Sequence, residues 1–386
     1  MKQGNKEQQA RSIPAIIVCS MKLTIAITGE VDEHLHLMNG WHVYDSSIPI
    51  RFGKGKELDE KMTSMQPGQP DPEQQREMEE DYGYAPIYTV QLLYKEKPVI
   101  DREALYAKII EYTGPVRTSE DLAEDTEETL AVWEARSEAG HEEDEDHYHF
   151  FHLNHTLNYQ EGPMPVQTVL MPVNDTPTVE MYETALQQSW HWAEAAGTIE
   201  ACQYELMLTD MMARGMPPQR RLPLFNNVLR AILEVAPCEA VYYKASDKLV
   251  SSAELLQALQ QDQQLYGALN IRLYQIPGDS ERKEMVMDSC GLAALGVPDV
   301  QCHFYDMEPG EVAQFLMNVA DYVYHQGDII ADGETIGLHE NQRWRVEHQY
   351  ALVMPRRVVL DLDPGETYYA GHQQSHPSSA GQDQVE

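Results

Sequence analysis

A stretch of fifty residues, 289–338, constrains the fold of this 386-residue chain more than any other segment. It begins with a turn of small residues at 290–298 and continues through an alternating strand pattern at 300–305. A helix is predicted from Pro309, because apolar residues then recur at the i, i+3, i+4 and i+7 positions of one buried face. The helix ends at Gly327, since glycine readily adopts the left-handed conformation that closes a helix. The stretch predicts a compact loop, strand, helix and loop, but no reaction.

Strand and helix patterns alternate along the chain from residue 87 onward. Strands are predicted at 87–94, 148–157, 166–171, 202–209, 240–243, 269–276, 284–287, 300–305 and 348–353. Helices are predicted at 101–112, 179–195, 222–233, 253–261 and 309–325. Adjacent strand patterns suit hairpins, and the crossovers are too few for an all-parallel sheet. We therefore predict an α+β fold with a mixed, largely antiparallel sheet, helices packed on one side, and a small N-terminal β-rich segment.

Composition divides the chain into four parts. Residues 1–52 are predicted to be the β-rich segment, and residues 53–84 are predicted to be a polar linker or loop around a run of proline, glycine and glutamine. Residues 85–363 are predicted to form the main domain, and residues 364–386 are predicted to be a disordered tail. An insertion at 119–146 carries thirteen acidic residues against Arg136 alone, with part of it expected to be an exposed helix around Trp133.

The charge of the chain restricts its partners. The 28 basic residues stand against 63 acidic ones, giving a formal net charge of −35. Nucleic acids and anionic membranes both attract cationic surfaces, so the sequence argues against either as a partner. A basic protein is the partner that this charge favours. The sequence indicates no oligomeric state.

The cysteines and apolar runs indicate a cytoplasmic protein. Five scattered cysteines are too few for a disulfide framework or paired zinc motifs, and we interpret them as reduced thiols. No run of eighteen apolar residues is present, so no membrane-spanning helix is predicted. Basic residues precede the apolar run at 13–19, but Lys22 interrupts it and no cleavage site follows, so secretion is not expected. Met21 is an alternative start.

The two loops of the 289–338 stretch resemble a bacterial family known as domain of unknown function 4261. The likeness lies in the turn at 290–298, the helix segment at 318–322 and the glycine-rich loop at 327–337. It covers roughly 86–356, is tightest at 289–337, and departs at Asp299, where glutamate is expected. This resemblance implies no catalytic residue. More faintly, the segment 204–208 is similar to the suppressor-of-fused type of domain, which implies protein binding and immunity to bacterial toxins.

Three constellations suggest chemistry but have simpler interpretations. Five histidines lie beside the acidic run, at His141, His147, His149, His152 and His155, yet their spacing matches no zincin or EF-hand pattern. The spacing of Gly291 and Gly296 is that of a phosphate loop, but no Lys-Ser or Lys-Thr follows. The sequence therefore predicts no metal and no cofactor.

The third constellation consists of Cys290, His303 and Asp306, the residue types of a thiol nucleophile, its base and an orienting acid. Closeness in sequence does not assemble them, because Cys302 and His303 point to opposite faces of their strand and Cys290 lies beyond a loop.

We therefore predict a protein-binding module, acting as an immunity or accessory factor of a toxin system. Its predicted partner-binding residues are Gly291, Gly296, Asp332, Gly333, Glu334 and Thr335. The alternative is an enzyme with a site near His303, Asp306 and the loop at 332–335.

Overall fold

The computed structural model describes residues 83–113, 132–135, 147–160, 162–276, 283–337 and 343–371. The N-terminal β-rich segment, all but the end of the linker, most of the acidic insertion and residues 372–386 lie outside the described part. Predictions for those segments stay predictions.

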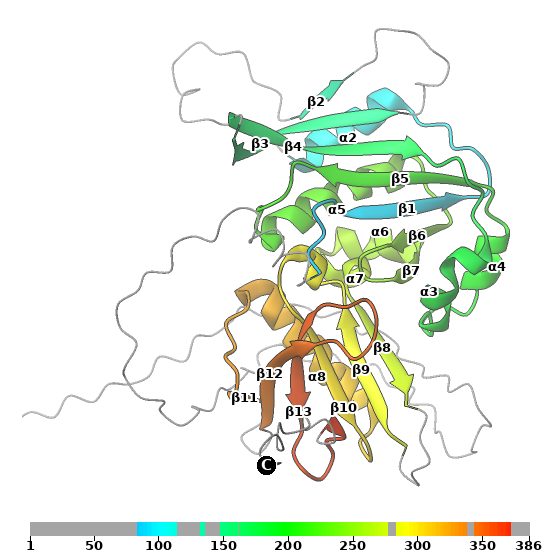
Figure 1. The fold of residues 1–386 in the computed structure, drawn as a ribbon. Coiled ribbons are helices and arrows are strands. Elements are labelled where there is room, and N and C mark those ends of the chain that lie inside the picture. The colour runs from blue at the N-terminus through cyan, green and yellow to red at the C-terminus, as the bar shows by residue number, and fades with distance from the viewer. Residues whose placement is uncertain are drawn as a thin grey trace, which may run out of the picture.

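The described strands form two sheets (Figure 1). The seven-stranded sheet has the order β2-β3-β4-β5-β1-β6-β7 and is antiparallel throughout. Its strands are β1 (Thr89–Tyr94), β2 (Val132–Ala135), β3 (Tyr148–Tyr159), β4 (Gly162–Pro172), β5 (Tyr204–Met211), β6 (Ala240–Tyr243) and β7 (Lys248–Ser251).

The six-stranded sheet has the order β11-β12-β13-β10-β9-β8. Its strands are β8 (Asn270–Gln275), β9 (Met285–Cys290), β10 (Asp299–Phe304), β11 (Thr335–Ile336), β12 (Trp344–Tyr350) and β13 (Val358–Asp363). Strands β10 and β13 pair in parallel, and the other pairs are antiparallel. A mixed, largely antiparallel α+β fold is therefore confirmed, although the strands divide between two sheets.

The longer helices pack on these sheets. They are α2 (Arg102–Thr113), α5 (Pro218–Val235), α6 (Ser252–Gln260) and α8 (Pro309–Gln326). The short ones are η2 (Val179–Tyr182), α3 (Glu183–Gln187), α4 (Ala195–Glu200), α7 (Leu265–Ala268) and η3 (Ala293–Leu295). Helix α8 covers β8, β9 and β10, and α5 contacts α2, α6, α8 and η3. The apolar face predicted for α8 is buried as expected.

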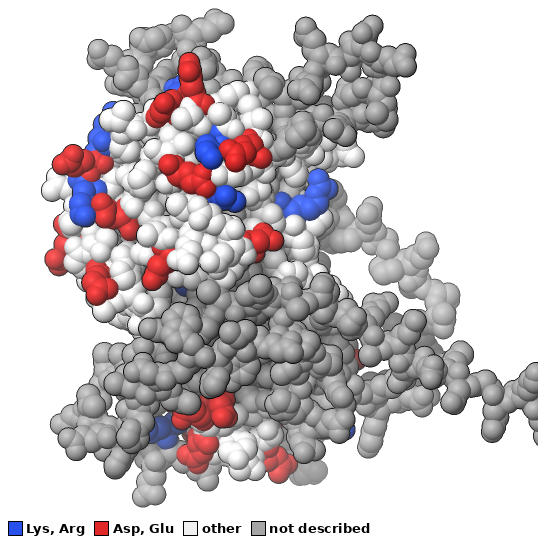
Figure 2. All heavy atoms as spheres, turned by 180° about the vertical axis from the view of Figure 1, so that it is seen from behind, with Lys and Arg blue, Asp and Glu red and all other residues white. Residues whose placement is uncertain are grey.

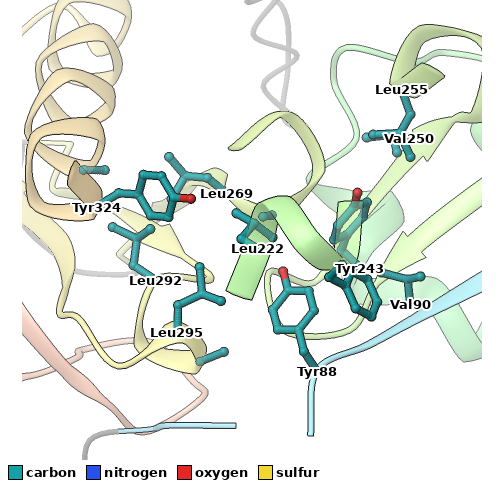
Figure 3. Close-up of a cluster of buried hydrophobic side chains, with 14 of the residues drawn as sticks. Tyr88, Val90, Leu222, Tyr243, Val250, Leu255, Leu269, Leu292, Leu295 and Tyr324 are labelled. Carbon is teal, nitrogen blue, oxygen red and sulfur yellow. The ribbon is translucent and has the colours of Figure 1, made fainter. Parts of the chain in front are cut away.

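One hydrophobic core runs through both halves of the molecule. The seven-stranded half is the sheet β1–β7 with its helices, and the six-stranded half is the sheet β8–β13 with α8. Side chains of both halves belong to a single cluster of buried residues. Figure 3 shows Leu222 and Tyr88 on one side of this cluster, with Leu292, Leu295 and Tyr324 on the other. The two sheets therefore share a core, which ties their packing together.

Two predicted elements are wrong. The helix at 179–195 is interrupted, because the Ser189 hydroxyl donates to the Ala185 carbonyl and the Trp190 indole donates to the Gln187 carbonyl. Such side-chain bonds compete with helical ones. The exposed helix expected around Trp133 is instead the strand β2, which pairs with β3.

Other boundaries differ in the six-stranded sheet and beside it. The strand expected at 348–353 is β12, which begins and ends earlier, at Trp344–Tyr350. The sequence patterns do not predict β7, β11 or β13. Residues 364–371, assigned to the disordered tail, return along β10, where Tyr369 bridges to Phe304 and its hydroxyl donates to Asp361.

Candidate functional site

Four buried charges lie at the end of the six-stranded sheet. Arg357 contacts Asp288 at 2.5 Å and Asp299 at 2.9 Å, and Arg272 contacts Asp288 at 2.6 Å. Each of these side chains is at most 2% exposed, so the two arginines and two aspartates compensate one another out of water. Burial lowers the pKa of Arg272, but its hydrogen bonds to Asp288 prevail and raise it above the ordinary value. We call these four residues the charge cluster.

Asp299 organises the turn that follows β9. Its carboxylate accepts hydrogen bonds from the backbone amides of Gly291, Leu292 and Ala293 at 3.1–3.3 Å, and from the Ser289 hydroxyl at 2.8 Å. A phosphate loop would offer such amides to a ligand. Here the protein's own carboxylate occupies them, so this turn is a structural element.

Arg357 also holds the loop between β12 and β13. Its Nη1 donates to the carbonyls of Val353 at 3.1 Å and Pro355 at 2.8 Å, and the backbone amide of Leu352 donates to the Gln301 side chain at 2.8 Å. Arg357 of the charge cluster and the neighbouring Gln301 therefore hold the backbone of this exposed loop in place.

A second exposed loop, residues 328–335, lies along β12, and we call it the acidic loop. The Nδ1 of His348 is 2.7 Å from Asp332 and its Nε2 is 3.0 Å from Asp328. Both ring nitrogens face carboxylate oxygens, so both act as donors, which requires the protonated ring. Burial lowers the pKa of His348, yet the two carboxylates prevail and raise it above the ordinary value. In return, His348 lowers the pKa of Asp332.

Backbone contacts fix this acidic loop further. The Glu334 carboxylate accepts from the amide of Ala331 at 2.9 Å, and the amide of Gly333 donates to the Val346 carbonyl at 2.8 Å. The Asp332 side chain nevertheless remains 65% exposed. The loop thus presents carboxylates to solvent in a defined geometry.

The predicted partner-binding residues lie in two separate loops and differ in how far they are exposed to solvent. Asp332 is exposed, and Gly333, Glu334 and Thr335 are half-buried in the acidic loop. Gly296 is exposed on the 290–298 turn, whereas Gly291 is buried against the Ala268 carbonyl. The binding role of these residues stays a prediction.

Cys290, His303 and Asp306 are not brought together. Cys290 pairs with Asn270 near one end of β9, whereas His303 pairs with Val286 near the other. Burial raises the pKa of the Cys290 thiol to about 12, which removes the thiolate needed for attack. His303 also lies on the face of its sheet opposite to His348, so it does not approach the acidic loop.

The histidines of β3 have separate partners. His149 bonds to Gln167, His152 to Thr168, and His155 to Arg220, while His147 is exposed and His141 lies outside the described residues. Within the described ranges, no group of three or more His, Cys, Asp or Glu side chains is arranged to hold a metal ion.

Sequence reasoning missed His348, Arg357, Arg272 and Asp288. His348 and Asp332 are 16 residues apart, and Arg357 and Asp288 are 69 apart, so no local spacing relates them. The one available signal is the occurrence of charged residues inside strand patterns, which burial permits only when they are paired.

None of the described helices combines the length and the apolarity needed to cross a membrane. Residues 288–363 match the model of a family described as Domain of unknown function (DUF4261). The match begins at Asp288 and ends at Asp363, so it includes Asp299, His348 and Arg357. Neither the curated proteins nor the solved structures contain a match to this chain.

Proposed function

We propose that this chain, which carries a DUF4261 domain at residues 288–363, is a module that binds a basic protein. The observation that supports this most is the acidic loop, where His348 holds Asp328 and Asp332 in place while Asp332 remains largely exposed. Charges fixed before binding lose less conformational freedom when a partner arrives. The loop therefore suits a cationic surface.

The charge of the whole chain supports the same kind of partner. The formal net charge is −35, and Figure 2 shows acidic side chains spread over one face with basic ones among them. Such a field steers a basic protein toward the surface and repels polyanions. A nucleic acid and an anionic membrane are accordingly not proposed as partners.

The biological role proposed with this binding is that of an immunity or accessory factor of a toxin system, in the cytoplasm. It rests on the likeness of residues 204–208 to suppressor-of-fused domains and on the acidic charge. In that role the chain would cover or accompany one basic protein.

A pull-down of the tagged full chain from lysate of its own host tests the proposal. We expect one basic protein to be captured at low salt and lost at high salt, because screening weakens complementary charges. The double variant Asp328→Asn and Asp332→Asn should capture less of it. The matched variant Glu194→Gln and Glu200→Gln, at exposed acidic residues of the other half, should capture as much as the wild type.

The proposal is contradicted if the captured protein stays bound at high salt and binds the loop variant as well as the wild type. The absence of any stoichiometric partner contradicts it too.

A further inference from the structure

We propose that the loop Ala351–Pro355, together with Tyr350, inserts into an apolar pocket of the basic partner and forms the centre of the docking surface. We call these six residues the apolar loop. This inference rests on the proposed function and adds to it the kind of pocket that the partner must offer.

The apolar loop exposes side chains that normally lie in a core. Residues 351–355 read Ala-Leu-Val-Met-Pro, five consecutive residues without a polar side chain. Met354 is 74% exposed, Tyr350 47% and Leu352 43%. Contiguous exposed apolar side chains on a soluble domain mark an interaction site, whereas isolated ones need no explanation.

The backbone of this loop is held in place although its side chains are not covered. Arg357 binds the carbonyls of Val353 and Pro355, and Gln301 binds the amide of Leu352. Arg357 is itself fixed by Asp288 and Asp299 in the charge cluster. A loop whose conformation is set before binding loses little conformational entropy on association. The apolar side chains are therefore presented ready to bind.

The apolar loop adjoins the acidic loop. Tyr350 follows His348 by two residues on β12, so both side chains leave the same face of the strand about 7 Å apart. His348 in turn binds Asp328 and Asp332. An apolar centre beside exposed charges is the usual composition of a protein interface.

The charges at this surface decide between possible occupants. A second copy of the chain would bring another formal charge of −35 and the same acidic loop to the contact, so self-association is opposed. A basic protein instead places cations opposite Asp328 and Asp332. Of the two arginines that follow the apolar loop, Arg357 is buried, and the exposed Arg356 lies over the Tyr350 ring with its guanidinium carbon 4.3 Å from the ring centre.

Site-specific photo-crosslinking of the full chain tests the inference. Met354 is replaced by the photoreactive amino acid benzoylphenylalanine, and the variant is irradiated in host lysate at low salt. The matched control carries the same amino acid at Val99, which is 94% exposed between β1 and α2 in the other half.

We expect position 354 to form an adduct with a basic protein, and position 99 to form none. Adding Leu352→Ser should reduce the yield at position 354 at least about fivefold, which is the loss expected when a central contact residue is truncated. An unchanged melting temperature in circular dichroism confirms that each variant folds.

Any other pattern overturns the inference: no adduct at position 354, equal adducts at both positions, a dimer of this chain, or a crosslink within one chain. The two proposals can fail separately. If the pull-down captures a basic protein in a salt-dependent way but position 354 forms no adduct with it, the protein-binding function stands and the apolar loop is not its centre.

Discussion

At the scale of single residues, Gly291 is a position where the backbone leaves no room for a side chain. Its φ is +133°, and a Cβ added there would lie 2.0 Å from the Ala268 carbonyl oxygen. Only a residue without a side chain allows β9 to pass this close to the end of α7. Gly291 therefore joins the two halves of the molecule at the start of the turn that Asp299 holds.

The variant Gly291→Ala should lower the free energy of unfolding by more than about 2 kcal/mol, because both the backbone conformation and the close approach resist a methyl group. Urea unfolding measures this change. Gly310→Ala is the control, since a Cβ at Gly310 meets nothing within 4 Å. A helical glycine replaced by alanine should be neutral or stabilising. Equal losses in the two variants would contradict the structural reason.

His348 is the residue whose charge fixes the acidic loop. Its pKa is raised in the folded chain by Asp332 and Asp328 despite its burial. A raised folded pKa means that the stabilisation is complete below the ordinary histidine pKa of 6.5 and is lost as pH rises through the folded value. The loop should therefore loosen as pH rises through the folded pKa of His348, which lies above 6.5.

An NMR titration of the His348 ring checks this directly. We expect a midpoint above 6.5 in the wild type, and a lower midpoint in the double variant Asp328→Asn and Asp332→Asn, because neutral amides no longer favour the imidazolium. His325, whose pKa is raised by Asp321, serves as an internal reference and should not move. An unchanged His348 midpoint in the variant would refute the assigned contacts.

At the scale of elements, β8 is an edge strand that the chain partly covers. The Gln188 side chain accepts from the Leu273 amide at 3.2 Å and donates to the Leu273 carbonyl at 3.3 Å. It thus supplies the donor and acceptor that a neighbouring strand residue would supply. Covering an edge in this way limits pairing with other chains.

The variant Gln188→Ala should lower the free energy of unfolding by about 1–2 kcal/mol, since two hydrogen bonds are lost. Hydrogen exchange at the Leu273 amide should also become faster. Gln203→Ala, at an exposed position, is the control and should leave both quantities unchanged. Unchanged protection at Leu273 in Gln188→Ala would show that the edge is covered by another group.

At the scale of the whole molecule, the shared core links two sheets that each carry a buried ion pair. Arg221 pairs with Asp210 at 2.6 Å in the seven-stranded half, and it also binds the carbonyl of Ala85 at 2.8 Å. The amide of Ala85 donates to Ala294 of the other half at 3.1 Å. The segment before β1 therefore connects both halves.

Because of this coupling, we expect one cooperative unfolding transition, with equal calorimetric and van't Hoff enthalpies. Arg357→Met should lower the free energy of unfolding by about 3–5 kcal/mol, because it leaves Asp299 buried without a cationic partner and leaves Asp288 with Arg272 alone. The matched variant Arg221→Met, in the other half, should shift the same transition. Two transitions, each sensitive to one variant, would mean that the halves unfold independently.

The local pattern of apolar and polar residues was enough to predict much of the secondary structure and the α+β class. The apolar spacing from Val312 to Val323 predicts α8, and the largely apolar strand pattern at 87–94 predicts β1, because the pattern of apolar residues indicates which side of an element is buried. The net charge of −35, on which the proposal of a basic partner is based, likewise depends on composition and not on how the chain folds.

The tertiary structure alone decided the arrangement of the candidate site. His348 meets Asp328 and Asp332, and Arg357 meets Asp288, across distances in sequence that no periodicity spans. The run Ala351–Pro355 has the composition of a strand, but it is an exposed loop, because Arg357 and Gln301 bind its backbone where a neighbouring strand would. Pairing between charges that are far apart in sequence depends on how the fold packs. The conformations of the acidic loop and the apolar loop therefore could not be predicted from the sequence.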